Sequence, residues 1–195
     1  MKICAAFFGA ALLMGAAADA QSQTRLRGTI ASVSGDVIAM RTTDGRNFDV
    51  HLGEKTGIVF AQPMPIAEIK AGDFLAVTSV KRSDGTLAAY DVRRFPKPVN
   101  PGHRPFDGGD DQTMTNATVS ATVNAAKGRE IVLTYDGGSQ KVVVADTASI
   151  TALVPGQRSQ LVPGSYVNLV ADAGADGRLT ARQIEVRKDP PRPPQ

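Results

Sequence analysis

The sequence has little of the chemistry that sulfur and aromatic rings provide. Its 195 residues include one cysteine, no tryptophan and two histidines. The cysteine, Cys4, lies in an N-terminal segment that we expect to be removed, so the mature chain has no thiol and no disulfide. A cysteine nucleophile, thiol redox chemistry and cysteine metal ligands are therefore excluded. Aromatic residues make up only 5% of the chain.

Neither sign of charge dominates, and long apolar runs are scarce. The chain carries 22 Lys and Arg against 19 Asp and Glu, a net charge of +3. This balance argues against binding to nucleic acid or to a membrane surface through charge alone. The apolar run Cys4–Ala17 has 14 residues, which is too short to span a bilayer.

This apolar run has the features of a signal peptide. Lys2 precedes it, and the small-residue site Ala18-Asp19-Ala20 follows it. We therefore predict a signal peptide over residues 1–20, cleaved between Ala20 and Gln21, and a periplasmic or secreted protein. The alternative is an uncleaved anchor. Lipidation is rejected because Cys4 lies far upstream of the cleavage site.

The mature chain contains an internal repeat with an offset of 92 residues. Ile69–Val77 (IKAGDFLAV) recurs as Leu161–Leu169 (LVPGSYVNL), and Ser83–Ala89 (SDGTLAA) recurs as Ala175–Ala181 (ADGRLTA). In the first strand of each unit, Thr29-Ile30 matches Thr122-Val123 at an offset of 93. The chain therefore contains two related units of about 70 residues.

Each unit reads as strand, strand, strand, short helical turn, strand, strand. In the first unit the strands are expected over 25–33, 37–42, 47–52, 74–81 and 87–95. Asp-Gly pairs such as Asp44-Gly45 and Asp84-Gly85 suit tight hairpin turns. Pro65–Ile69 suits one helical turn that begins with proline.

We therefore predict an all-β fold of two tandem five-stranded OB-like small barrels, each with a short helical turn between strands three and four. Their packing is expected to use an apolar face, because each core alone would be small. The predicted parts are a signal peptide (1–20), barrel unit 1 (24–95), a Pro/Gly-rich linker (96–116), barrel unit 2 (117–188) and a disordered Pro-rich tail (189–195).

The chain resembles a bacterial exported family catalogued as domain of unknown function 5666. The resemblance rests on the repeat motifs above, on Gly28-Thr29-Ile30, and on the linker stretches Gly102–Asp107 and Thr113–Ala117. It covers nearly all of the mature chain and implies the two-unit fold, but no reaction. Some similar proteins carry a metal-transporter permease label, which implies at most a connection with metals, because no membrane span follows the signal peptide here.

The linker holds the candidate metal ligands His103, Asp107, Asp110 and Asp111, with Met114 just beyond. Imidazole and carboxylates together suit a divalent transition metal, and carboxylates alone suit Ca²⁺. The spacing fits no standard metal motif, so the alternative is a solvated polar linker. On the strand over 47–52, His51 and Asp49 lie on one face, where a ligand pair and a plain solvated face are both open.

No catalytic residues are predicted, and the chain is not expected to be an enzyme. Neither histidine lies near a nucleophile elbow, and no glycine-rich phosphate loop opens a helix. Arg25, Arg27, Arg93 and Arg94 are expected to cluster if the first and last strands of unit 1 are neighbours. Such a patch would suit an anionic ligand or an acidic partner, and the alternative is an ordinary charged surface.

The sequence thus favours an exported, non-enzymatic binding or interaction module of the bacterial envelope, without a resident cofactor. Its partner would be an envelope protein or a small anionic ligand, met at the linker and the adjoining barrel faces. One alternative is a periplasmic metal-binding accessory protein that uses His103, Asp107, Asp110 and Asp111. Another is a purely structural envelope protein.

Overall fold

The computed structural model describes residues 23–106, 111–125 and 128–192, so the predicted signal peptide lies outside the described residues. This part of the chain is all-β, as predicted. Its strands are β1 (Gln23–Ser34), β2 (Val37–Thr42), β3 (Asn47–Pro63), β4 (Phe74–Lys81), β5 (Leu87–Phe95), β6 (Gly102–Pro105), β7 (Gln112–Ala125), β8 (Gly128–Tyr135), β9 (Gly138–Pro155), β10 (Tyr166–Ala173) and β11 (Leu179–Arg187). Single 3-10 turns, η1 (Ile66–Glu68) and η2 (Arg158–Gln160), follow β3 and β9.

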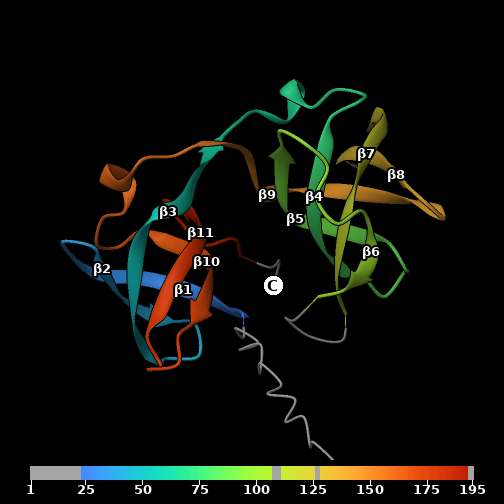
Figure 1. Ribbon diagram of the computed structural model, residues 1–195. Helices are drawn as coiled ribbons and strands as arrows, with labels where there is room; N and C mark the ends of the chain where they lie inside the picture. The colour runs from blue at the N-terminus through green and yellow to red at the C-terminus, as the bar shows by residue number, and fades with distance from the viewer. Residues whose placement is uncertain (1–22, 107–110, 126–127, 193–195) are drawn as a thin grey trace, which may run out of the picture.

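The strands close into two five-stranded rings. The terminal barrel runs β1, β2, β3, β11, β10 and back to β1, with β3 and β11 parallel. The central barrel runs β4, β5, β9, β8, β7 and back to β4, with β5 and β9 parallel. Figure 1 shows the two barrels as separate lobes. Closure leaves neither ring with a continuous open edge.

The tandem prediction required each barrel to use the five strands of one repeat unit, and neither barrel does so. The hairpin β4–β5 follows β3 in sequence but closes the ring of β7–β9, whereas β10–β11 closes the ring of β1–β3. The central barrel is therefore one continuous segment, residues 64–155, inserted into a terminal barrel built from both ends of the chain. The repeat could not predict this exchange of hairpins, because the two hairpins are similar in sequence and either one could close either barrel.

The exchange runs along two long strands, β3 and β9. The sequence predicts that the third strand ends at residue 52, but β3 continues to Pro63. It pairs first with β2 and β11 in its own barrel, and then with β9 from Val59 to Pro63. Figure 1 shows β3 and β9 passing between the two lobes. This extension depends on pairing partners distant in sequence, which strand periodicity does not reveal.

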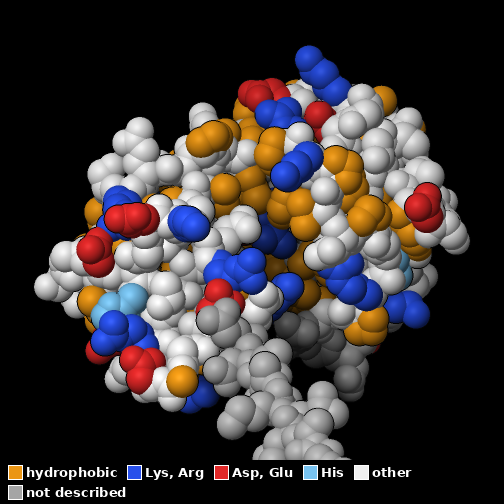
Figure 2. Space-filling model, viewed as in Figure 1, with side chains coloured by type: hydrophobic (Ala, Val, Ile, Leu, Met, Phe, Trp, Pro, Cys, Tyr) orange, Lys and Arg blue, Asp and Glu red, His pale blue; other side chains and the backbone are white. Residues whose placement is uncertain are grey.

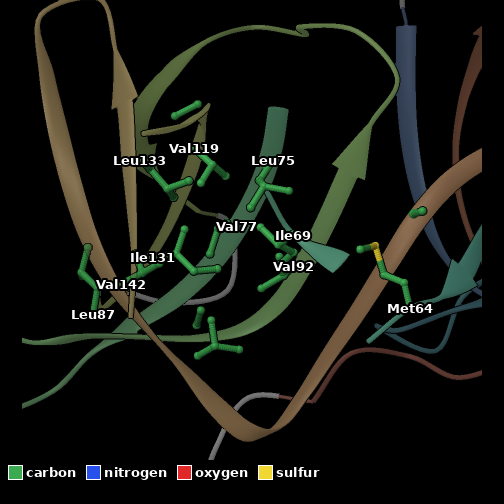
Figure 3. Close-up of a cluster of buried hydrophobic side chains, with 14 residues drawn as sticks. Met64, Ile69, Leu75, Val77, Leu87, Val92, Val119, Ile131, Leu133 and Val142 are labelled. Atoms are coloured by element: carbon green, nitrogen blue, oxygen red, sulfur yellow. The ribbon is translucent and has the colours of Figure 1, made fainter. Parts of the chain in front are cut away.

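Each barrel encloses its own apolar core. In the central barrel the core includes Leu75, Val77, Val119, Ile131 and Leu133, each at most 1% exposed, and Figure 3 shows these side chains pointing toward one another. The terminal barrel has a core of the same kind, with these residues buried: Leu26, Ile30, Ile38, Met40, Val50, Leu52, Leu161, Val167, Leu169, Ala171, Ala181, Ile184 and Val186.

The turns follow the sequence closely. In the described residues the glycines of four Asp-Gly pairs, Gly45, Gly85, Gly137 and Gly177, have φ between 77° and 91°, a region that favours glycine. Gly28 has a different role, because a Cβ built on it would lie 2.1 Å from the carbonyl oxygen of Arg41. The close approach of β1 and β2 at this point therefore requires glycine.

The sequence match between the first strands of the two units was wrong by four residues. Ile30 pairs with Met40 just before a bulge in β1, and Val119 pairs with Leu133 just before a bulge in β7. The structural equivalent of Ile30 is therefore Val119, not Val123. The sequence was ambiguous here, because Thr-Val occurs at both 118–119 and 122–123.

The predicted linker contains less irregular chain than expected. Residues 96–116 include β6 and the start of β7, and β6 pairs with β7 alone among the described strands. Residues 189–192 contain neither helix nor strand, and 193–195 lie outside the described residues. Within the part of the chain that the structure describes, no helix is long and apolar enough to cross a membrane.

Candidate functional site

The predicted metal ligands do not form a site in the described part of the chain. His103, on β6, is half-buried, and its Nδ1 lies 2.8 Å from Oγ1 of Thr115 on β7. Burial lowers the pKa of His103. Asp111 is exposed, and Asp107 and Asp110 lie outside the described residues. No group of three His, Cys, Asp or Glu side chains within 23–106, 111–125 and 128–192 is arranged to hold a metal ion.

The second histidine is likewise without a ligand group in this part of the structure. His51 and Asp49 lie on β3 opposite Val37 and Ala39 of β2, so the expected shared face is present. Asp49 is exposed and His51 is half-buried. Two ligands on one strand need a third from elsewhere, and the described residues supply none.

The arginines that were expected to cluster divide into three groups. Arg25 and Arg27 lie on the outward face of β1, since Leu26 between them is buried in the terminal barrel. Arg93 lies between the barrels. Arg94, the next residue on β5, points to the opposite side of the strand from Arg93. Its Nη1 lies 3.7 Å from the Asp73 carboxylate and 3.4 Å from the carbonyl oxygen of Glu68.

Arg25 and Arg27 instead join Arg46 around an open concavity of about 190 Å³ in the terminal barrel. We call this the arginine concavity, and its lining consists of Arg25, Leu26, Arg27, Thr42, Thr43, Asp44 and Arg46. It forms where β1 meets the β2–β3 turn, held by a hydrogen bond from the Thr43 N–H to the Arg27 carbonyl oxygen, 3.0 Å. Three arginines and two threonines thus line the concavity together with one acidic residue, Asp44.

That carboxylate, Asp44, is tied into the turn. It accepts hydrogen bonds from Oγ1 of Thr42 and, at 2.8 Å, from Nε of Arg46. The Thr42 hydroxyl and then Arg46 lower the pKa of Asp44 to about 2. Arg46 also lies over the Phe48 ring, 5.2 Å from its centroid. Asp44 is therefore ionised and paired with Arg46, and the lining as a whole contains three arginines and one carboxylate.

The concavity opens beside the junction of the two barrels. The Arg27 guanidinium lies 4.8 Å from the centroid of the Phe106 ring. Phe106 follows β6 in the segment predicted to be a linker, residues 96–116. Figure 2 shows Lys and Arg side chains gathered around the hollow between the lobes. The linker and an adjoining barrel face thus meet at a basic surface.

Between the barrels lies a ring of four alternating charges, which we call the charge quartet: Asp91, Arg93, Glu185 and Arg187. Arg93 donates from Nη1 to Oε2 of Glu185 at 2.9 Å, and Arg187 from Nη1 to Oδ1 of Asp91 at 3.0 Å. Each arginine also contacts the acid on its own strand, at 3.4 Å for Arg93–Asp91 and 2.5 Å for Arg187–Glu185. Since β5 carries one pair and β11 the other, the quartet connects the two barrels.

The quartet is buried and electrically balanced. Its side chains are between 3% and 13% exposed. Burial by itself would raise the pKa of Glu185, but the charges of Arg93 and Arg187 outweigh burial and lower it. Nearby, burial and then Asp91 raise the pKa of Tyr90 to about 12. The packing face that was expected to be apolar therefore includes four buried charges.

Sequence reasoning found only one member of the quartet, Arg93. A pattern could have shown the rest, because the last strand of each unit contains an acid, a valine and an arginine in a row, at 91–93 and at 185–187. Two charges at alternate positions on a strand otherwise rich in buried residues are costly unless paired.

No family model, curated protein or solved structure gives a significant match to this chain.

Proposed function

We propose that this protein is an exported, non-enzymatic binding module that holds an anionic group of a small ligand in the arginine concavity. The observation that carries the proposal is that Arg25, Arg27 and Arg46 line one open concavity together with Thr42 and Thr43. Guanidinium groups bind carboxylate and phosphate oxygens through paired hydrogen bonds. An open surface favours a ligand that exchanges readily.

The strand order supports an OB-like assignment for both barrels. In the terminal barrel the order is first, second, third, fifth and fourth strand, with the third and fifth parallel. The central barrel follows the same order when β7, β8 and β9 are counted as its first three strands. Five-stranded OB-like barrels serve many ligand classes, so the fold alone does not select one.

A binding role also suits the groups that would otherwise suggest catalysis. His103 contacts the Thr115 hydroxyl, but Thr115 is fully buried and so out of reach of a substrate. Asp44, with its low pKa, would be a poor general base near neutral pH. These residues support a scaffold that presents charge and does not transfer protons.

Titration with inorganic pyrophosphate at low ionic strength tests the proposal. We expect weak binding, with a Kd on the order of 0.1–1 mM, and NMR shift changes at the amides of residues 25–27 and 42–46. Arg25→Gln should weaken binding about 5-fold or more, and added salt should weaken it in the wild type. Arg129→Gln, an exposed arginine on β8 of the central barrel, is the matched control.

Two outcomes would contradict the concavity as the site. One is the absence of shift changes at residues 42–46 when pyrophosphate binds. The other is equal weakening by Arg25→Gln and Arg129→Gln, which would indicate a diffuse effect of charge. Export is tested separately by the mass of the N-terminal peptide after periplasmic fractionation, which should begin at Gln21.

A further inference from the structure

The two halves of the chain interlock. The first half, β1–β5 (residues 23–95), gives three strands to the terminal barrel and a hairpin to the central barrel. The second half, β7–β11 (residues 112–187), does the reverse. Where the halves cross, β3 and β9 pair about Ala61 and Leu153, two residues separated by the repeat offset of 92. The halves are thus related by an approximate two-fold axis at this pair.

Backbone pairing would allow a half to combine with its own kind. Leu179 of β11 pairs with Val50, and Leu87 of β5 pairs with Val142, so the two hairpins enter their barrels in the same register. The crossing strands are also alike, since both end in proline, Pro63 and Pro155. Main-chain hydrogen bonds do not distinguish the two hairpins.

The charge quartet does distinguish them. Arg93 and Glu185 occupy equivalent positions at the offset of 92, and they bind each other. If two first halves combined by the same symmetry, Arg93 would face a second Arg93. If two second halves combined, Glu185 would face a second Glu185. Both arrangements would bury like charges.

The second ion pair of the quartet also disfavours the pairing of two identical halves. Arg187 binds Asp91, but the residue equivalent to Asp91 in the second half is Gln183, and the one equivalent to Arg187 in the first half is Phe95. Asp91 would therefore face phenylalanine in a pairing of first halves, and Arg187 would face glutamine in a pairing of second halves. Both ion pairs that the quartet forms between β5 and β11 would be lost.

We propose that the charge quartet specifies the pairing partner: each half selects the complementary half and rejects a copy of itself. In the intact chain the complementary half is supplied by the same molecule. A chain opened between β5 and β6 would select the complementary half of a second copy by the same contacts. Burial of like charges against a background of equal backbone pairing is an effective source of such specificity.

The full-length chain tests this with one protease site placed in the exposed stretch Pro96–Pro98. The cleaved protein is unfolded in urea, refolded by dilution and measured by native mass spectrometry, since the two halves differ in mass. Wild type should return complexes of one first half and one second half, with like pairs at least about 100-fold rarer. A statistical mixture of the three pairings would overturn the proposal, as would halves that fail to recombine.

Charge variants separate specificity from simple stabilisation. Arg93→Gln with Glu185→Gln should raise the fraction of like pairs about 10-fold or more, whereas the reversed pair Arg93→Glu with Glu185→Arg should keep complementary pairing. Arg94→Gln, on the opposite face of β5, should leave the distribution unchanged. If the neutral pair does not fold, the reversed pair decides, because loss of its selectivity would contradict the proposal. Unchanged selectivity in the neutral pair would also contradict it.

Discussion

Arg93 and Glu185 come from different barrels and from different halves of the chain, and they form a 2.9 Å ion pair between the two lobes. Arg93 also contacts Asp91 on its own strand, and Glu185 also contacts Arg187 on its own strand. The junction therefore depends on a closed ring of charges and not on a single pair. A ring of this kind is sensitive to the loss of any member, because each removal leaves buried charge without a partner.

Arg187 is the most buried member, and its removal should have the largest effect on stability. Its side chain is 3% exposed, and Arg187→Met would leave Asp91 and Glu185 facing only Arg93. We expect a loss of about 3–5 kcal/mol in the free energy of unfolding, measured by urea denaturation. Arg178→Met, at an exposed pair with Asp176, should change it by less than about 0.5 kcal/mol. Equal effects would contradict a structural role for the quartet.

Glu185 should make the protein sensitive to acid. Because its pKa is lowered in the folded state, it binds protons more readily after unfolding, where its pKa is about 4.3. Its contribution to stability is therefore present above that value and is lost as pH falls through the lower, folded value. Urea midpoints measured from pH 7 downward should fall below about pH 4, and less steeply in Glu185→Gln. The exposed control Glu54→Gln should follow wild type.

The local elements were predictable because their causes are local. β2, β4 and β5 match the predicted strands over 37–42, 74–81 and 87–95, since alternation and Asp-Gly turns depend on neighbouring residues. The exchange of hairpins was not predictable, because Val59–Pro63 finds its partner in β9, about 90 residues away. Because the two units are similar in sequence, each hairpin could close the barrel of its own unit or that of the other unit.

The candidate site was predictable only in part, for a related reason. Arg25 and Arg27 could be paired from their spacing on one strand, but Arg46 joins them through the packing of the β2–β3 turn. Arg93, grouped with them in the sequence, is held by Glu185 of the other half. The predicted ligands Asp107 and Asp110 lie outside the described residues, so the structure places only His103 and Asp111 of that set.

Gly28 should be intolerant of any side chain. A Cβ there would lie 2.1 Å from the Arg41 carbonyl oxygen and 2.7 Å from the Thr42 Cα, and both are backbone atoms that cannot rotate away. Gly28→Ala should therefore destabilise the protein by about 2 kcal/mol or more, measured by thermal and urea unfolding. Gly53→Ala is the control, since its nearest atom would lie 3.7 Å away. Similar losses in both variants would show that β1 and β2 separate easily.

The arrangement of the barrels predicts which fragments fold alone. Residues 64–155 contain every strand of the central barrel in one segment, along with its core. Residues 24–95, the unit that the repeat suggests, contain three strands of one barrel and a hairpin of the other, so they close neither ring. Circular dichroism and cooperative thermal unfolding should show a folded monomer for 64–155 and no cooperative transition for 24–95.

The second fragment carries the sharper test. A monomeric, cooperatively folded 24–95 would mean that the hairpin β4–β5 returns to its own β1–β3, as in tandem barrels, and that the exchange is only one of two stable arrangements. Its dimerisation would instead bring Arg93 against Arg93, which the quartet disfavours. Mixing 24–95 with 112–187 should then restore the cooperative transition, because each half supplies the hairpin that closes a ring of the other.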